Sequence, residues 1–298
     1  MPPIHHTPMA MPLSSSATFL VLIVASFLYV RGWRRMSRAS ANAITTWRLA
    51  SFLFGVSLVW AALGSPLVAY DHDLLTVHMI QHLLLMTFAP ALILLGEPLL
   101  VIWHSLPRFG KVVLSPLFRP PLVQRLAHKL SRPALCWSVS ALTLVGWHVP
   151  ALFTLGMHSE VWHGVEQASF LGAGFLFWLP VVQPWPAVSM GPQWSTLLYL
   201  FLATLPCDLL SGFLVFSDRV AYPLYFSMPR HFGFSVLEDQ QCAAALMWTC
   251  VTLVYLVPAA ILSTRLLSPR SFYRGDLVQS ELRGGATSQT DSQRLEIV

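Results

Sequence analysis

The residues best suited to chemistry in this sequence are two histidines in an otherwise apolar stretch. His78 and His82 lie four residues apart in HMIQHLLLMTFAPALILLGEP. Residues spaced i and i+4 share one face of a helix, so the two imidazoles can bind one metal ion, as the paired histidines of helical zinc sites do. The alternative is that both histidines only hydrogen-bond neighbouring helices. We take the pair as the centre of a candidate metal site.

Further side chains that can bind a metal ion occur before and after this pair. They are His72, His148, His163, Glu166, Cys207, Asp208, Asp239, Cys242 and Met247. Imidazole is a ligand for copper, zinc, iron and nickel, and cysteine or methionine sulfur favours Cu(I). Facing histidines could instead bind a haem iron, although no pair at matched depth is clear. Copper is therefore the cofactor that we expect, with Cu(I) favoured.

The elements that must position these residues are membrane-spanning helices. The chain has 298 residues, of which 55% are hydrophobic and 10% are charged, and its mean hydropathy is +0.61. A bilayer core about 30 Å thick takes roughly 20 helical residues to cross. We find seven apolar runs that can serve as spans, near 17–31, 47–68, 74–103, 133–155, 161–182, 194–216 and 237–264. The predicted fold is an all-α polytopic bundle of about seven transmembrane helices.

The distribution of basic residues predicts the orientation of this bundle. Of the 18 lysines and arginines, all but Arg219 and Arg230 fall in the first loop, in the third loop or in the C-terminal tail. The positive-inside rule then places the N-terminus outside and the C-terminus in the cytoplasm. The first run is predicted to be an anchor rather than a signal peptide, because no basic residue precedes it. This topology explains the net charge of +5, so the charge does not indicate a nucleic-acid partner.

The same pattern divides the chain into three predicted regions. Residues 1–16 form a periplasmic N-terminal segment. Residues 17–267 form the seven-helix membrane domain, in which 105–132 is an amphipathic loop on the cytoplasmic surface of the bilayer. Residues 268–298, rich in Ser, Gln and Gly, form a disordered cytoplasmic tail.

This topology brings the candidate ligands to one layer near the outer side of the membrane. His78 and His82 lie roughly 6 and 12 Å below the outer mouth at 1.5 Å per residue. Ionisable groups at such depth are costly and usually mark a pathway or a site. We predict that one ion is held by ligands from several helices, namely His78, His82, His148 and His163. Asp208 and Asp239 either support these ligands or only cap helix ends, and Met247 either binds the ion or packs in the core.

Four stretches of the sequence occur together in a known family. HMIQHLLLMTFAPALILLGEP, GWHVPALF, HGVEQASFLGAGFLFWLPV and YPLYFSMPRHFGFSVLEDQQCAAALMW follow the order found in the CtaG family of multi-span, caa3-type cytochrome c oxidase assembly factors, which the chain resembles over about residues 50–260. The family's motifs fall on His78, His82, His148, His163, Asp239 and Gln240. Many relatives have a second histidine where this chain has Gln167, which leaves Glu166 or another residue to complete the ligand set.

The resemblance implies a bacterial inner-membrane protein that helps copper reach a haem-copper oxidase. Its partners would be the oxidase subunits and a periplasmic copper chaperone. The leading hypothesis is therefore a copper-handling assembly factor without catalytic turnover. The alternative is a transporter of a metal ion or protons, which the apolar inner halves of the spans disfavour. An enzyme is the third hypothesis, and no nucleophile or cofactor motif in the sequence assigns it a reaction.

Overall fold

Helices make up the described part of the chain, as its composition predicts. The computed structural model describes residues 13–39, 44–107, 109, 111, 125, 129–184, 193–229 and 233–267, and no strand occurs among them. Six helices in these ranges are long and apolar enough to cross a membrane, or seven if one bent pair counts as a single span. The chain is therefore a multi-pass membrane protein with an all-α fold. The direction in which the bundle crosses the membrane stays a prediction.

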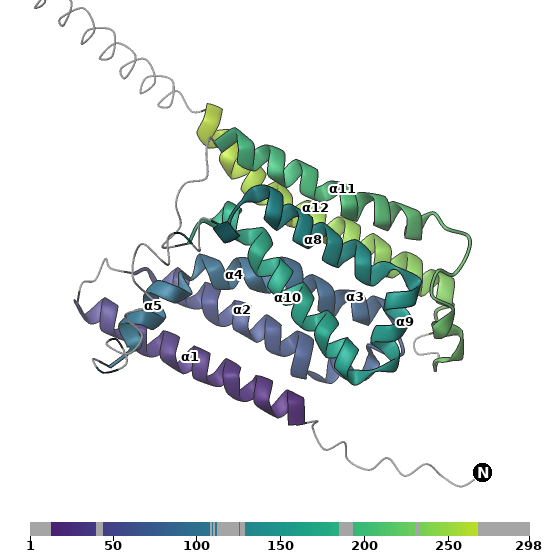
Figure 1. Cartoon of the computed structure of the whole chain (residues 1–298), viewed down its shortest axis with the longest axis horizontal. Helices are drawn as coiled ribbons and strands as arrows, with labels where there is room; N and C mark the ends of the chain where they lie inside the picture. The colour runs from purple at the N-terminus through teal and green to yellow at the C-terminus, as the bar shows by residue number, and fades with distance from the viewer. Residues whose placement is uncertain are drawn as a thin grey trace, which may run out of the picture.

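The helices lie side by side in a bundle, with α1 at one edge and α11 at the other (Figure 1). In chain order the elements are α1 (Leu13–Ala39), α2 (Thr46–Gly64), η1 (Pro66–Tyr70), α3 (Leu75–Leu83), η2 (Leu84–Phe88), α4 (Ala89–Leu95), α5 (Pro98–Ser105), α8 (Pro133–His148), α9 (Pro150–His158), α10 (Glu160–Val182), α11 (Gln193–Val215), η3 (Pro223–Ser227) and α12 (Val236–Leu267). Contacts join α3 to α12, and α4 to both α2 and α10. The span built from α3, η2 and α4 is thus the centre of the bundle.

This central span contains a π-helical turn, η2, between two α-helical segments. The N–H of Ala89 donates to the carbonyl of Leu84, five residues earlier. Pro90 has no N–H to give to Met86 four residues before it, and its ring disfavours a regular turn at this place. The helix α10 approaches closely here, since a Cβ at Gly174 would lie 2.5 Å from the carbonyl oxygen of Met86. The π turn therefore sits in a tight contact directly after the histidine pair.

The predicted third span, 74–103, is too long, because the helix ends at Leu95. Glu97 adopts a left-handed conformation with φ of 53° and precedes Pro98, which begins α5. A residue before proline is disfavoured in the α region, so the helix breaks at this point. Tyr29 donates from its hydroxyl to the carbonyl of Gly96 at 2.6 Å, and Arg48 pairs with Glu97 at 2.5 Å. These contacts fix the break, and α5 packs against α1 as a separate helix.

The predicted fourth span, 133–155, is broken into α8 and α9, which meet at an angle of 76°. The break falls at Val149, directly before Pro150. Proline removes a backbone donor and restricts the residue before it, which ends α8 at His148. As a consequence, α9 runs across the end of the bundle (Figure 1) and packs against α10.

Three predicted regions lie wholly or largely outside the described residues. Residues 1–12 of the N-terminal segment are outside them, and α1 begins at Leu13, earlier than the predicted residue 17. Most of the predicted amphipathic loop at 105–132 and the whole tail from 268 to 298 are also outside them. The three-region division stays a prediction.

Candidate metal centre

A histidine pair and a glutamate meet in the interior of the bundle. His78 and His82 both lie on α3, and their Nε2 atoms are 2.7 Å apart. Glu166 on α10 places its Oε1 atom 3.5 Å from Nε2 of His78 and 3.2 Å from Nε2 of His82. The pair found by its spacing therefore faces a carboxylate from a second helix. We call these three residues the inner cluster.

The inner cluster has the dimensions of a metal site. Ligand atoms that are each about 2.0–2.2 Å from one ion are roughly 3 Å from one another, and the three distances here are 2.7, 3.2 and 3.5 Å. The side chains of His78, His82 and Glu166 are only 0%, 7% and 1% exposed. At 2.7 Å the two imidazole nitrogens are within hydrogen-bond distance, and a metal ion would replace the proton of such a hydrogen bond. The residues therefore fit an ion that is shielded from solvent.

Three polar atoms of the inner cluster have no hydrogen-bond partner among the described residues. They are Nδ1 of His78, Nδ1 of His82 and Oε2 of Glu166. The Oε2 atom lies 3.6 Å from Nδ1 of His163, which is three residues before Glu166 on α10. Metal-bound histidines usually donate their second N–H to a carboxylate, a carbonyl or water. The described residues do not supply that support to the pair.

A close helix approach and a helix cap position the inner cluster. A Cβ at Gly156 on α9 would lie 2.7 Å from Oε2 of Glu166, so the glycine lets α9 pack directly behind the carboxylate. Asp239 of α12 accepts hydrogen bonds from the backbone N–H of Leu75 at 2.7 Å and of Thr76 at 3.1 Å. The Thr76 hydroxyl donates to the same carboxylate at 2.6 Å. Asp239 thus caps the helix that carries the histidine pair, which is the second of its two predicted roles.

A second group of ligands lies at the turn before α3. His163 Nε2 is 3.3 Å from Oδ2 of Asp71, and His72 Nε2 is 3.6 Å from Oδ1 of the same carboxylate. Gln81 donates to Asp71 at 3.2 Å, and the Gln167 amide nitrogen lies 2.8 Å from Nε2 of His163. Burial raises the pKa of Asp71, but the hydrogen bond from His163 and the nearby imidazoles outweigh it, so the pKa falls below the ordinary value. We call Asp71, His72 and His163 the outer cluster.

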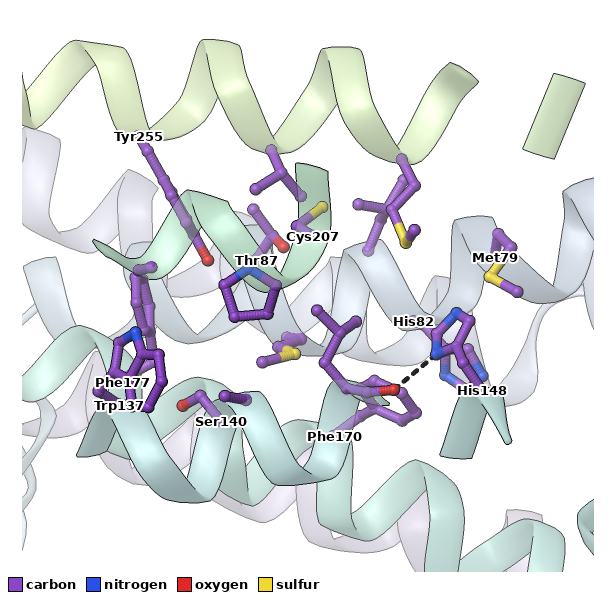
Figure 2. Close-up of a pocket in the computed structure, with 18 residues that line it drawn as sticks. Met79, His82, Thr87, Trp137, Ser140, His148, Phe170, Phe177, Cys207 and Tyr255 are labelled. Carbon is purple, nitrogen blue, oxygen red and sulfur yellow. Dashed lines mark hydrogen bonds between the residues drawn. The ribbon is translucent and has the colours of Figure 1, made fainter. Parts of the chain in front are cut away.

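A cavity of about 40 Å³ lies beside His82 (Figure 2). Its lining includes a second histidine, His148, and four sulfur-bearing residues, Met79, Met86, Cys207 and Met247. His148 donates from Nδ1 to the carbonyl of Leu144 at 2.7 Å, so its Nε2 atom carries a lone pair, and that atom is buried without a partner among the described residues. The structure therefore brings the predicted ligands His148, Cys207 and Met247 to one cavity that His82 also lines.

Other predicted site residues stand apart from both clusters. Cys242 is exposed on α12, and Asp208 is half-buried on α11. Within the described ranges no hydrogen bond or ion pair joins either residue to the clusters. Gln240 accepts from the N–H of Ala221 at 2.7 Å and donates to the carbonyl of Leu214 at 3.3 Å. The DQ pair therefore holds α12 to α3 and to the connection that follows α11.

Sequence reasoning missed Asp71 as a candidate ligand, but it named Glu166 as a supporting residue or an alternative ligand. Glu166 can be found from the sequence because it shares a helix face with His163 at i and i+3. Asp71 lies in a turn, where no helical spacing predicts which way a side chain points. Its place beside His163 depends on how the turn after η1 packs against α10.

The sequence matches a known protein family and several curated proteins. The sequence model of the family described as "Cytochrome c oxidase caa3 assembly factor (Caa3_CtaG)" matches residues 27–268. Uncharacterised proteins of Mycobacterium bovis and Mycobacterium tuberculosis are each 24% identical over 259 residues, which cover 82% of this chain and 37% of theirs. One from Mycobacterium leprae is 26% identical over 245 residues, or 79% of this chain and 36% of its own. The chain thus spans little more than a third of the length of these curated relatives.

No solved structure matches the chain. The family match covers both clusters and nearly all of the described helices. The resemblance noted from the sequence motifs is therefore confirmed, and this chain belongs to the caa3-type cytochrome c oxidase assembly factor family.

Proposed function

We propose that this protein binds copper in the inner cluster and assists its insertion into a haem-copper oxidase. It would act in the bacterial inner membrane, with the oxidase subunits and a periplasmic copper chaperone as partners. The single observation that carries the proposal is the meeting of His78, His82 and Glu166 at mutual distances of 2.7 to 3.5 Å inside a membrane bundle. Membership of an oxidase assembly family supports an assembly role for such a site.

The environment of the inner cluster suits temporary binding of the ion. Loss of the partners that support ligating histidines typically costs 10–100-fold in metal affinity, and neither Nδ1 atom of the pair has such a partner among the described residues. The adjacent cavity adds the buried lone pair of His148 and the sulfur atoms of Cys207 and Met247. Sulfur ligands favour Cu(I) over harder ions. These features support release to an acceptor, with copper as the ion.

The rest of the bundle favours delivery on one side over transport across it. A cavity of about 590 Å³ lies further along α12, lined by apolar side chains apart from Thr87 and Arg265. A guanidinium is cationic and has no lone pair to offer a metal ion. Transport would need polar ligands to continue from the inner cluster to the opposite end of the bundle. This lining supports the assembly role.

The test replaces the ligands and follows the protein, its metal and the oxidase together. The variants are His78→Ala with His82→Ala, and separately Glu166→Gln, which keeps the shape of the side chain. His158→Ala, an exposed histidine at the end of α9, is the matched control. Copper in the purified full chain is measured by elemental analysis, and oxidase activity and oxidase copper are measured in cells over a range of medium copper.

We expect both ligand variants to accumulate in the membrane, to lose bound copper and to lower oxidase copper, with partial rescue by added copper through mass action. The control should behave as the unaltered protein. Normal oxidase copper in cells with stable ligand variants would overturn the proposal. A fall in protein abundance that accounts for the whole loss of oxidase would instead assign the histidines a structural role and would also overturn it.

A further inference from the structure

The outer cluster is separate from the inner cluster, and we propose that it is a second metal position, which receives the ion from outside and passes it inward through His163. This inference rests on the proposed function, because it assumes that the inner cluster binds copper. Asp71, His72 and His163 each offer a ligand atom to one place within 4.8 Å of the others. The candidate ligands would thus form two separate sites, and His163 would contact both of them.

The first support is that the exposed fraction of the side chains is higher in the outer cluster than in the inner cluster. The His72 side chain is 47% exposed, that of His163 is 12% exposed and that of Asp71 is 1% exposed. The three side chains of the inner cluster are 0–7% exposed. His72 is therefore the candidate ligand most accessible to an external metal donor, and the inner cluster is much less accessible.

The second support is an unpartnered buried atom that faces the outer cluster. Asp71 is fully buried, and its Oδ1 atom has no hydrogen-bond partner among the described residues. That atom lies 3.6 Å from Nε2 of His72, while Oδ2 is held by Gln81 at 3.2 Å. A buried carboxylate oxygen without a partner is costly, and a cation removes that cost. Asp71 is thus oriented with one oxygen held by the protein and one free for an ion.

The third support is the position of His163 between the two clusters. Its Nε2 atom lies 3.3 Å from Oδ2 of Asp71, and its Nδ1 atom lies 3.6 Å from Oε2 of Glu166. The ring centroids of His72 and His78 are 5.3 and 5.7 Å from that of His163. An ion can therefore exchange ligands one at a time, leaving His72 and Asp71 as it gains Glu166 and the histidine pair.

The ligand set defines the class of ion. Each cluster offers two imidazole nitrogens and one carboxylate, a set that suits copper and zinc and does not suit magnesium or calcium. Because the two clusters offer the same types of ligand, neither should bind the ion so tightly that it prevents transfer to the other. The ion would then move inward because it is supplied at the exposed outer cluster and removed from the buried inner cluster.

The experiment titrates the purified full chain in detergent with Cu(II) chloride, because Cu(II) binds imidazole and carboxylate ligands and its EPR spectrum reports neighbouring copper ions. Bound copper per chain is measured in parallel. The outer variants are His72→Ala and, independently, Asp71→Asn, and the inner variant is the double replacement of His78 and His82 by Ala. His72 is exposed, so its replacement should leave the fold intact.

We expect two copper ions per unaltered chain, with an EPR signal broadened by their proximity. Each outer variant should retain one ion with a narrow signal and should fill the inner cluster at least tenfold more slowly. The inner variant should also retain one ion, with about unchanged affinity for it. Two ions in either outer variant would overturn the inference. A single ion in the unaltered chain that is lost only in the inner variant would overturn it while sustaining the proposed function, and failure to bind copper at all would overturn both.

Discussion

Glu166 is the residue of the inner cluster that contacts His163 of the outer cluster. Its Oε1 atom faces the histidine pair at 3.2 and 3.5 Å, and its Oε2 atom faces His163 at 3.6 Å. A buried carboxylate is tolerated only when it is paired with a cation or well hydrogen-bonded. Three imidazoles around one carboxylate provide that pairing whether the cation is a proton or a metal ion. The geometry of the inner cluster is therefore stabilised without a bound metal ion.

Gly156 offers a residue-level test of this geometry. We expect Gly156→Ala to push the carboxylate of Glu166 away from the histidine pair, since its Cβ would lie 2.7 Å from Oε2. Copper affinity should fall by about tenfold, which corresponds to about 1.4 kcal/mol, while the amount of protein in the membrane stays close to normal. The measurement is a competition titration of the purified protein with a copper chelator.

The matched control is Gly164→Ala on α10, where a Cβ would meet nothing within 4 Å. Because both substitutions add one methyl group near the same end of α10, only the contact with Glu166 distinguishes them. Equal affinities in the two variants would show that the position of the carboxylate does not matter for binding.

At the scale of residues, candidate ligands that share one helix can be predicted from their spacing in the sequence, whereas a candidate ligand in a turn cannot. The spacing of His78 and His82 was sufficient to predict a shared face, and their nitrogens are 2.7 Å apart. Gln167 lies beside His163 and is thus at the outer cluster. Asp71 could not be predicted because its contacts come from tertiary packing of the turn after η1.

At the scale of elements, the histidine pair depends on how α3 begins. The first N–H groups of a helix have no partner within the helix, and a side-chain oxygen normally satisfies one of them. For α3 the oxygen comes from Asp239 of α12, 164 residues away from Leu75 along the chain. This long-range cap joins the start of one span to the start of another and fixes the height of the histidine pair.

Removal of this cap should lower the stability of the protein without removing a candidate metal ligand. We expect Asp239→Ala to lower the free energy of unfolding by about 1–2 kcal/mol, the cost of losing a helix cap, and to leave copper stoichiometry unchanged at saturating copper. Asp218→Ala, at an exposed position of the connection between α11 and α12, is the control and should change neither quantity. Thermal unfolding in detergent measures the first effect and elemental analysis the second. Loss of copper at unchanged thermal stability would contradict the capping role.

Hydropathy alone does not predict the helix breaks found within the third and fourth predicted spans. Both runs are apolar on either side of the break, so the mean hydropathy of the run does not mark it. The signals are local: Glu97 precedes Pro98, and Val149 precedes Pro150. Proline within an apolar run is compatible with a kink, a break or an intact span, and tertiary contacts decide among them. The break at Val149 matters for function, because it brings Gly156 against Glu166.

At the scale of the whole molecule, both clusters lie near the end of the bundle at which α3 and α10 begin and α9 crosses (Figure 1). The composition and the length of the apolar runs predict about seven spans, and the described residues contain six, or seven if α8 and α9 count as one span. The sidedness of the bundle is a separate prediction, because it rests on basic residues in loops, several of which lie outside the described ranges. If that prediction holds, copper is received on the outer side of the membrane.

Reporter fusions test this sidedness directly. Alkaline phosphatase inserted after Asp218 should be active, because the connection between α11 and α12 is predicted to face outward, and the same enzyme at the C-terminus should be inactive. A fluorescent protein that matures only in the cytoplasm should give the opposite result at the C-terminus. Phosphatase activity at the C-terminus alone would reverse the topology and place the clusters on the cytoplasmic side.

The π turn η2 has an evolutionary consequence. A π turn is an α-helical turn with one additional residue, and each residue rotates an α-helix by about 100°. Deleting one residue from Leu84–Phe88 would therefore rotate α3 by about 100° relative to α4, and His78 and His82 would leave the face that meets Glu166. A single inserted codon in an ancestral regular helix is geometrically sufficient to turn two histidines toward a carboxylate. The proposed metal site could thus be gained or lost without the substitution of any candidate ligand.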